Sequence, residues 1–263
     1  MSVSVSNLSK VYGEQRAVDS ISFTINSGEV VGFLGPNGAG KSTTMKMITG
    51  FLEADNGDVK VCGLKNLDDP LAFKRKIGYL PENNPLYYDM YIKEYLAFVA
   101  SLYQVKKPML RVAEMIEMTG LQREQGKKIG QLSKGYKQRV GIAQAMIHNP
   151  EVLILDEPTS GLDPNQLVEI RELISNLGKE KTIILSTHIM QEVEAMCKRV
   201  IILNRGKIVA DDSMSHVKAR SHKQAFVNFK AKGKKAGNFH IDHIIFEDLE
   251  NDFIRASSTK ENA

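Results

Sequence analysis

A glycine-rich stretch from Gly35 to Thr43 constrains the fold of this chain more than any other feature. It fits the pattern G-x-x-x-x-G-K-[S/T], in which glycines let the backbone curl so that successive N–H groups point at a phosphate chain. The apolar segment Glu29 to Leu34 before it is typical of a short buried strand, and Met45 and Ile48 follow at helical spacing. Because a strand, this loop and a helix occur in that order, we favour a phosphate-binding loop over a glycine-rich turn that binds nothing.

The residues of this loop are expected to divide the work of binding a nucleotide. Lys41 would place an ammonium on the β- and γ-phosphates of ATP, and Ser42 would offer a hydroxyl to Mg²⁺. The helix that begins near Lys41 adds the positive end of its dipole. The predicted ATP-binding residues of the loop are Gly35, Pro36, Asn37, Gly38, Ala39, Gly40, Lys41, Ser42 and Thr43.

Composition is that of a soluble globular protein. The chain has 263 residues, 42% hydrophobic and 25% charged, and its formal net charge of +4 is too small to indicate nucleic-acid binding by itself. Cys62 and Cys197 form no motif with each other, which favours a reducing cytosol. The apolar runs are far shorter than the ~20 residues of a membrane helix, and Met1 to Lys10 lacks the apolar stretch of a secretion signal. We therefore expect any membrane span to come from a partner.

The order of the patterns predicts an α/β fold. Alternating apolar residues between Val3 and Ile25 favour an N-terminal antiparallel β subdomain. Continuous apolar runs such as Val152 to Leu155 alternate with helical patterns, which is typical of a mostly parallel sheet. Residues from about Pro81 to His148 show helical periodicity without convincing strands. The sequence therefore predicts a P-loop NTPase core with an antiparallel β subdomain and an inserted helical subdomain.

Two acidic residues follow the apolar run at 152–155. Asp156 stands at the end of the expected strand, where a carboxylate can hold Mg²⁺ together with Ser42. Glu157 is the candidate general base that orients the attacking water. The alternative for Glu157 is a residue that only caps a turn, and the surrounding motifs disfavour it.

One further stretch, Gln131 to Arg139, resembles the Leu-Ser-Gly-Gly-Gln signature of ABC-type ATPases. The downstream segments Asp156 to Pro164 and Ser186 to His188 also match the order of motifs in that family. These elements cover Tyr12 through Gly206, so the chain resembles the ATP-binding subunit of an ABC transporter. The segment Gly78 to Glu82 narrows the resemblance to single-cassette exporter subunits, including those associated with gliding motility in Bacteroidetes-type bacteria.

The resemblance implies roles for residues outside the loop. Tyr12 matches the aromatic residue that stacks on adenine, although a tyrosine in a turn can also pack on the core. Ser133 and Gly135 match residues that face the γ-phosphate bound by the opposite subunit. Asp163 matches the D-loop, which communicates across the dimer. His188 matches the switch histidine, which contacts the γ-phosphate and helps to hold the attacking water.

The chain departs from the family pattern at three positions. Glu82 occupies the place of the Q-loop glutamine; a glutamate can orient water or approach Mg²⁺, but it repels phosphate unless the metal intervenes. Lys134 and Tyr136 replace the first glycine and the glutamine of the signature. Lys134 adds positive charge near phosphate, whereas Tyr136 removes an amide contact.

The character of the chain changes after Val217. Lys218 to Gly237 holds seven basic residues and no acidic one, and alternating or apolar residues follow at 244–246 and 253–254. We expect an ABC ATPase domain over residues 1–217 and a basic, β-rich C-terminal appendage over 218–263 that ends in a free tail. A solvated face explains the basic segment better than binding of nucleic acid or anionic lipid.

The expected function is that of an ATP-hydrolysing subunit that dimerises around two ATP and powers a separate membrane permease. The expected direction is export, with gliding motility as one setting, and the expected location is the cytoplasmic face of the inner membrane. The groove that receives a membrane-subunit helix would include Leu86 to Tyr88, for which core packing is the alternative. Other hypotheses are a soluble ABC ATPase that clamps nucleic acid or the ribosome, and a nucleotide-gated structural partner. The single cassette and the absence of a long coiled-coil insertion disfavour a nucleic-acid partner.

Overall fold

The central element of the computed structural model is a six-stranded sheet. The model describes residues 1–221, 226–230, 235–241, 244–248 and 253–258. In spatial order the strands are β5 (Ile77–Leu80), β6 (Val152–Asp156), β7 (Thr182–Thr187), β3 (Val30–Leu34), β8 (Arg199–Asn204) and β9 (Lys207–Ser213). The five strands from β5 to β8 are parallel to their neighbours. All residues of β6 and β7 are buried, as expected of apolar runs covered on both faces.

A second sheet contains the N-terminal strands. Its order is β2 (Gln15–Ile25), β1 (Val3–Tyr12) and β4 (Asn56–Val61), and both pairs are antiparallel. Val3 pairs with Ile25 on one side and with Val61 on the other, and all three side chains are fully buried. Helix α1 (Lys41–Ile48) contacts both sheets, so the two share one hydrophobic core. The predicted antiparallel subdomain and the mostly parallel core are confirmed.

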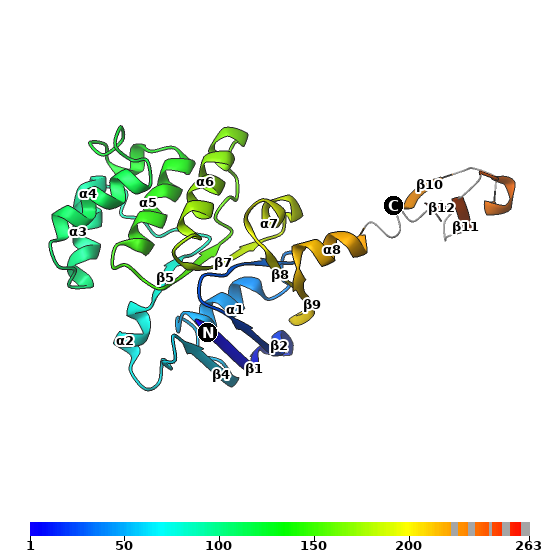
Figure 1. The fold of residues 1–263 in the computed structure, drawn as a ribbon, viewed down its shortest axis with the longest axis horizontal. Helices are drawn as coiled ribbons and strands as arrows, with labels where there is room; N and C mark the ends of the chain where they lie inside the picture. Colours follow the sequence, from blue (N-terminus) through cyan, green and yellow to red (C-terminus); the bar gives the residue numbers. More distant parts are fainter. Residues whose placement is uncertain (222–225, 231–234, 242–243, 249–252, 259–263) are drawn as a thin grey trace. The chain divides into compact units, whose positions relative to one another are not determined.

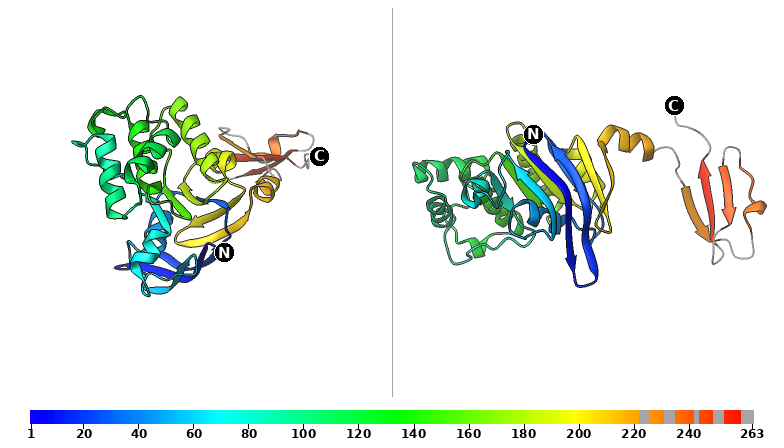
Figure 2. Two further views of the ribbon diagram at one scale, coloured as in Figure 1. Left: turned by 60° about the vertical axis from the view of Figure 1, so that its left-hand side comes forward. Right: turned by 90° about the horizontal axis from the view of Figure 1, so that it is seen from below.

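Three helices lie between β5 and β6 in the chain and gather at one end of this unit (Figures 1 and 2). They are α3 (Ile92–Leu102), α4 (Pro108–Met118) and α5 (Lys134–Met146). Helix α5 packs so closely on β5 that a Cβ at Gly78 would collide with the carbonyl oxygen of Ala145. Helices α3 and α4 pack against α5 and against each other. The helical periodicity of this section thus corresponds to three helices, of which α5 docks directly on the edge strand of the sheet.

The remaining helices of this unit are short or cover the sheet. They are α2 (Pro70–Arg75), α6 (Pro164–Leu177) and α7 (Met190–Met196), with a 3₁₀ turn, η1, at Ile129–Gln131. Asp163 caps α6 by accepting a hydrogen bond from the N–H of Gln166 at 2.9 Å, and Pro164 is the first residue of α6, a position that favours proline. Among the described residues, no helix combines the length and apolarity needed to cross a membrane.

Contacts divide the chain into two compact units, Met1–Asp211 and Asp212–Ala263. The second unit contains α8 (Met214–Ser221), a 3₁₀ turn η2 (Ala236–Asn238) and an antiparallel sheet of order β10 (Phe226–Lys230), β12 (Phe253–Ser258) and β11 (Ile244–Asp248). The rings of Phe229, Phe239 and Phe246 contact one another beside this sheet. Of the predicted basic segment and tail, residues 222–225, 231–234 and 259–263 lie outside the described residues.

The parallel register brings the chemically interesting segments to one edge of the large sheet. Leu34 pairs with Thr187 and Asp156 pairs with Ser186 where their strands end. Because parallel strands end at the same edge, the loops after β3, β6 and β7 are neighbours, and ligands of open α/β sheets bind at this carboxyl edge.

Candidate nucleotide-binding and catalytic site

The loop between β3 and α1 has the geometry of an anion cradle. Gly40 has a φ of 103°, and a Cβ at this position would collide with the carbonyl oxygen of Ala17, so only glycine fits. No side chain caps the N-terminus of α1. The first N–H groups of α1 therefore remain available to a phosphate, as helix N-termini commonly are in phosphate sites.

Lys41 lies in this cradle with its side chain only 6% exposed. Its ammonium donates hydrogen bonds to the carbonyl oxygens of Gly35 at 2.7 Å and Pro36 at 3.2 Å. It also lies 3.6 Å from Oε1 of Glu157. A buried cation is thus positioned between the predicted phosphate loop and the predicted catalytic base.

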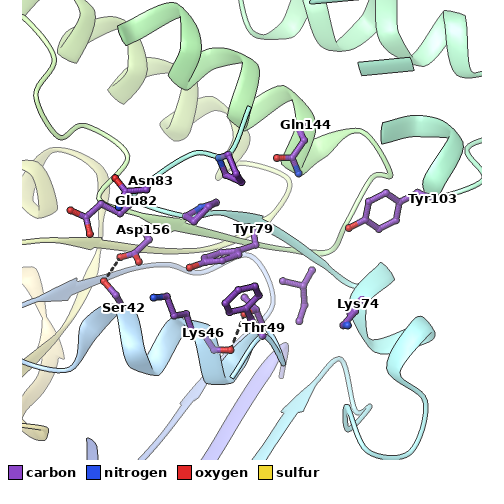
Figure 3. A pocket seen from close by; sticks show the side chains of 14 residues that line it. Ser42, Lys46, Thr49, Lys74, Tyr79, Glu82, Asn83, Tyr103, Gln144 and Asp156 are labelled. Atoms are coloured by element: carbon purple, nitrogen blue, oxygen red, sulfur yellow. Dashed lines mark hydrogen bonds between the residues drawn. The ribbon is translucent and has the colours of Figure 1, made fainter. Parts of the chain in front are cut away.

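Asp156 is a buried carboxylate, and one of its oxygens accepts hydrogen bonds from two hydroxyl groups. Ser42 Oγ donates to Asp156 Oδ1 at 3.0 Å, and Ser186 Oγ donates to it at 2.6 Å (Figure 3 shows the Ser42 bond). Ser186 belongs to the motif Ser186 to His188, but the motif alone predicted no role for this serine. The signal that would have found it is the pairing of two buried strands whose ends carry Asp156 and Ser186.

The oxygen donors at this point suit Mg²⁺, a hard cation that prefers carboxylate, hydroxyl and phosphate oxygens. Ser42 and Asp156 are in contact, and Glu82 lines the same cavity, on the side of Asp156 in Figure 3. In the part of the chain that the structure describes, no group of three or more His, Cys, Asp or Glu side chains could hold a metal. Mg²⁺ in nucleotide sites is usually held by one or two protein oxygens together with phosphate oxygens and water, and Ser42 and Asp156 would supply the protein oxygens here.

Glu157 and His188 meet at the ends of β6 and β7. His188 Nδ1 donates to Glu157 Oε2 at 3.1 Å, and the side chain of His188 is 46% exposed while that of Glu157 is 9% exposed. The Glu157 N–H donates to Ser186 Oγ at 2.9 Å. The structure therefore brings the three predicted catalytic residues, Lys41, Glu157 and His188, into one contact network.

A cavity of about 440 Å³ holds most of the predicted ATP site. Residues Asn37 to Thr43 line it together with Tyr12, Glu82, Glu157 and His188. Tyr12 is half exposed, so one face of its ring is available to a flat base. Gln15, Ala17 and Ser160, which were not predicted as site residues, also line this cavity. Gln15 pairs with the predicted Tyr12 across the β1–β2 turn.

Ser133 and Gly135 do not line that cavity. They lie at the start of α5, where Ser133 Oγ accepts hydrogen bonds from the N–H of Tyr136 and from Nε2 of Gln166, both at 3.4 Å. A Cβ at Gly135 would press on the side chain of Gln166. The signature segment is thus joined to the start of α6, next to Asp163, and its Ser133 and Gly135 lie outside the cavity that the phosphate loop lines.

A larger cavity of about 570 Å³ extends from the candidate metal ligands toward the helices (Figure 3). Ser42, Glu82 and Asp156 line one part of it, and Lys74 and Tyr103 line another. The Tyr79 hydroxyl is buried in it without a protein partner, and burial together with the charges of Asp156 and Glu82 raises the pKa of Tyr79. Of the residues predicted to form a docking groove, Leu86 is buried in the core, whereas Tyr87 and Tyr88 are exposed and lie outside this cavity.

A family model described as "ABC transporter" matches residues 18–160 of the chain. The chain belongs to the ABC transporter family. It is 38% identical over 223 residues to the bacitracin transport ATP-binding protein BcrA of Bacillus licheniformis, a match that covers 84% of this chain and 72% of that protein. The linearmycin resistance ATP-binding protein LnrL of Bacillus subtilis is 40% identical over 210 residues, covering 78% of this chain and 67% of that protein.

Solved structures of ABC transporter proteins share this fold. An ATP-binding subunit of an ABC transporter aligns with a TM-score of 0.75 at 31% identity, covering 84% of this chain and 93% of that chain. A dimeric ATP-binding cassette in a post-hydrolysis state with ADP and Pi aligns with a TM-score of 0.74 at 28% identity, covering 81% and 98%. The chain is therefore a single-cassette ATP-binding subunit of the ABC transporter family and an ATPase, as its motifs predicted. The alternative of a soluble clamp on nucleic acid or the ribosome is not favoured by these relatives.

Proposed function

We propose that two copies of this subunit close around two ATP molecules and drive a separate membrane permease that exports its substrate. The observation that carries this proposal is the split of the site within one chain. Lys41, Glu157 and His188 share one contact network, whereas Ser133 and Gly135 lie outside the cavity that the network lines. A second copy, placed head to tail, would supply the missing groups, and a dimeric cassette is among the similar structures.

On this proposal each residue of the phosphate cavity has a definite task. Tyr12 stacks on the adenine, and the loop N–H groups and Lys41 hold the phosphates. Glu157 accepts the proton of the attacking water, because it lines the same cavity. His188 holds Glu157 through its Nδ1 and contacts the γ-phosphate through its other ring nitrogen.

Ser42 and Asp156 would hold Mg²⁺, with Glu82 near it. The ion would supply positive charge that neutralises the β- and γ-phosphates. Glu82 lines the larger cavity together with Ser42 and Asp156, so a cation held there would offset the repulsion between the glutamate and phosphate. Glu82 can then orient water at the same place where the family usually has glutamine.

Closure of the dimer would bring Ser133, Gly135 and the N-terminus of α5 onto the γ-phosphate held by the other copy. The phosphate charge would then be satisfied from both sides and would hold the interface together. Asp163 lies at the start of α6, which contacts the signature segment through Gln166. Hydrolysis and release of phosphate would weaken this attraction and reopen the dimer.

The larger cavity of Figure 3 is the proposed docking place for a helix of the permease. Ser42, Glu82 and Asp156 line this cavity, so a helix that moves within it would contact or displace the candidate metal ligands. The subunit would then act peripherally at the cytoplasmic face of the inner membrane. The relatives named for bacitracin transport and linearmycin resistance favour export.

A role in gliding motility is a narrower form of the same proposal. It rests only on the resemblance of Gly78 to Glu82 and of the signature to subunits of that kind. Deleting the gene in a gliding host and scoring surface movement tests this role. Normal gliding in the deletion strain would contradict the role in motility and would leave the proposed ATP-driven export unchanged.

The proposal as a whole is tested by trapping the closed state. Glu157→Gln removes the base but keeps a side chain of the same size, so the variant is expected to bind ATP, to hydrolyse it very slowly and to run as a dimer in light scattering with ATP. Glu180→Gln, at an exposed position in the turn after α6 and outside both cavities, is the matched control and is expected to hydrolyse ATP normally and stay monomeric. Normal hydrolysis by Glu157→Gln, or a persistent monomer, contradicts the proposal.

A further inference from the structure

The proposed mechanism uses the buried carboxylates of Asp156 and Glu157 but gives no role to the buried carboxylate of Glu192. Glu192 lies in the first turn of α7 and is 1% exposed. Its Oε2 accepts a hydrogen bond from Thr159 Oγ1 at 2.6 Å and another from Thr187 Oγ1 at 2.6 Å. Burying a carboxylate is costly unless hydrogen bonds replace water, and these two short bonds do so.

One threonine lies in the loop that carries Glu157, and the other directly precedes the loop that carries His188. Thr187 is the last residue of β7 and directly precedes His188, and its hydroxyl also accepts the N–H of Ile189 at 3.1 Å. Thr159 follows Glu157 in the turn after β6. Both threonines are buried, Thr187 completely and Thr159 with 3% exposure. One oxygen atom therefore ties the Glu157 loop to the His188 loop.

This connection lies beyond the pairing of the two strands. The ladder between β6 and β7 ends at the pair Asp156 and Ser186, and Thr187 pairs with Leu34 of β3 instead. No backbone pairing between β6 and β7 therefore holds Glu157 beside His188. Past that point the two segments are joined by the hydrogen bond from the Glu157 N–H to Ser186 Oγ and by the two hydrogen bonds that Glu192 accepts. Glu157 and His188 are themselves in contact at 3.1 Å.

We infer that Glu192 is a positioning residue for ATP hydrolysis, which holds Glu157 and His188 at their working separation through Thr159 and Thr187. The inference rests on the proposed roles of Glu157 and His188. Glu192 does not touch the nucleotide cavity, so it acts through the two loops and not on the substrate. Loss of the tie is expected to lower the rate of hydrolysis while ATP binding by the phosphate loop continues.

The first test removes one hydroxyl and keeps the side-chain shape. Thr159→Val is expected to lower kcat about 10- to 100-fold, in line with the cost of about 1 Å of misplacement at a reacting group. The KM for ATP and the dissociation constant of a non-hydrolysable analogue are expected to stay at the wild-type values. The matched control is Thr119→Val, which removes an equally buried hydroxyl that donates to Met115 O at 2.7 Å within α4. It is expected to lose stability and to keep its kcat.

The second test separates positioning from packing at Glu192 itself. Both Glu192→Gln and Glu192→Leu remove the charge. Glu192→Gln keeps a carbonyl oxygen that can accept hydrogen bonds from both threonine hydroxyls, whereas Glu192→Leu has no such oxygen. We expect Glu192→Gln to recover most of the kcat that Glu192→Leu loses. Should the leucine variant fail to fold, the comparison of Thr159→Val with Thr119→Val still decides, since thermal unfolding reports whether each is folded.

The outcomes distinguish this inference from the proposed function. If wild-type protein hydrolyses ATP and Thr159→Val does so at the same kcat, or if its loss appears in KM alone, Glu192 is not a positioning residue. If Thr159→Val and Thr119→Val lose the same fraction of the wild-type kcat, the hydrogen bonds of Glu192 have a purely structural role. If the wild type itself hydrolyses no ATP while binding it, the proposed roles of Glu157 and His188 fail instead.

Discussion

Glu157 owes its orientation to its backbone as well as to its side chain. Its φ of 48° lies in the left-handed region, which is uncommon for a residue with a Cβ and costs of order 1–3 kcal/mol. The bond from its N–H to Ser186 Oγ, at 2.9 Å, holds it there. Because the same hydroxyl donates to Asp156, one serine fixes both acidic residues at the end of β6.

Replacing Ser186 by alanine tests this at the scale of a single residue. The change leaves the buried Glu157 N–H and one lone pair of Asp156 without their partner, so the free energy of unfolding is expected to fall by about 1–3 kcal/mol. The kcat for ATP is expected to fall with it, because Glu157 is free to leave the strained conformation. Urea unfolding and steady-state hydrolysis measure the two effects. Ser6→Ala, at an exposed position of β1, is the control, and a Ser186→Ala protein that matches it in both measurements contradicts this account.

At the scale of helices and strands, periodicity and burial predicted most of the fold. Val152–Asp156 is a strand because its apolar run is buried on both faces, and α6 begins at Pro164 because Asp163 caps it. The sequence could not provide the register Asp156 to Ser186 or the contact of Glu192 with two threonines, since both depend on how separate elements pack. The candidate ATP site was predictable because its motifs are local, whereas the side chains that support it come from distant segments.

The helical insertion is fixed to the sheet at its base by His148. This residue follows α5, its Nε2 donates to the carbonyl oxygen of Ile77 at the start of β5 at 3.0 Å, and its ring stacks on Tyr103 at the end of α3 with centroids 3.8 Å apart. Its Nδ1 is buried without a partner, so the site accommodates a neutral ring and disfavours a second proton. Three elements of the insertion and the core therefore depend on one neutral imidazole.

This arrangement predicts how the stability of the fold depends on pH. Burial lowers the pKa of His148 to about 4, below its ordinary value of 6.5. The unfolded chain takes up a proton near pH 6.5 while the folded chain does not, so the contribution of His148 to stability is lost as the pH falls from about 6.5 toward 4. At pH 5 the loss relative to pH 7 is expected to be about 2 kcal/mol. Urea unfolding of the wild type and of His148→Gln at both pH values measures it, and an equal pH dependence in the two proteins contradicts the prediction.

At the scale of the whole molecule, the chain holds two half-sites that do not meet. The phosphate loop, Glu157 and His188 lie in one cavity, and Ser133 lies outside it, at the exposed start of α5. A substitution in either half-site should therefore abolish ATP hydrolysis when all copies carry it. A variant with a damaged phosphate loop still has an intact signature segment, and a variant with a damaged signature segment still has an intact phosphate loop.

Mixing two inactive variants uses this difference. Lys41→Ala destroys the phosphate loop and keeps the signature; Ser133→Arg keeps the loop but fills the exposed start of α5, at a cost of about 1 kcal/mol for the lost cap. In a mixed dimer the intact loop of one copy faces the intact signature of the other, so the mixture is expected to recover part of the wild-type hydrolysis that neither variant shows alone. Titrating one variant into the other at fixed total protein, and following phosphate release, should give a maximum near equal amounts. A mixture that stays inactive, although light scattering detects mixed dimers with ATP, would mean that the signature does not complete the site of the other copy.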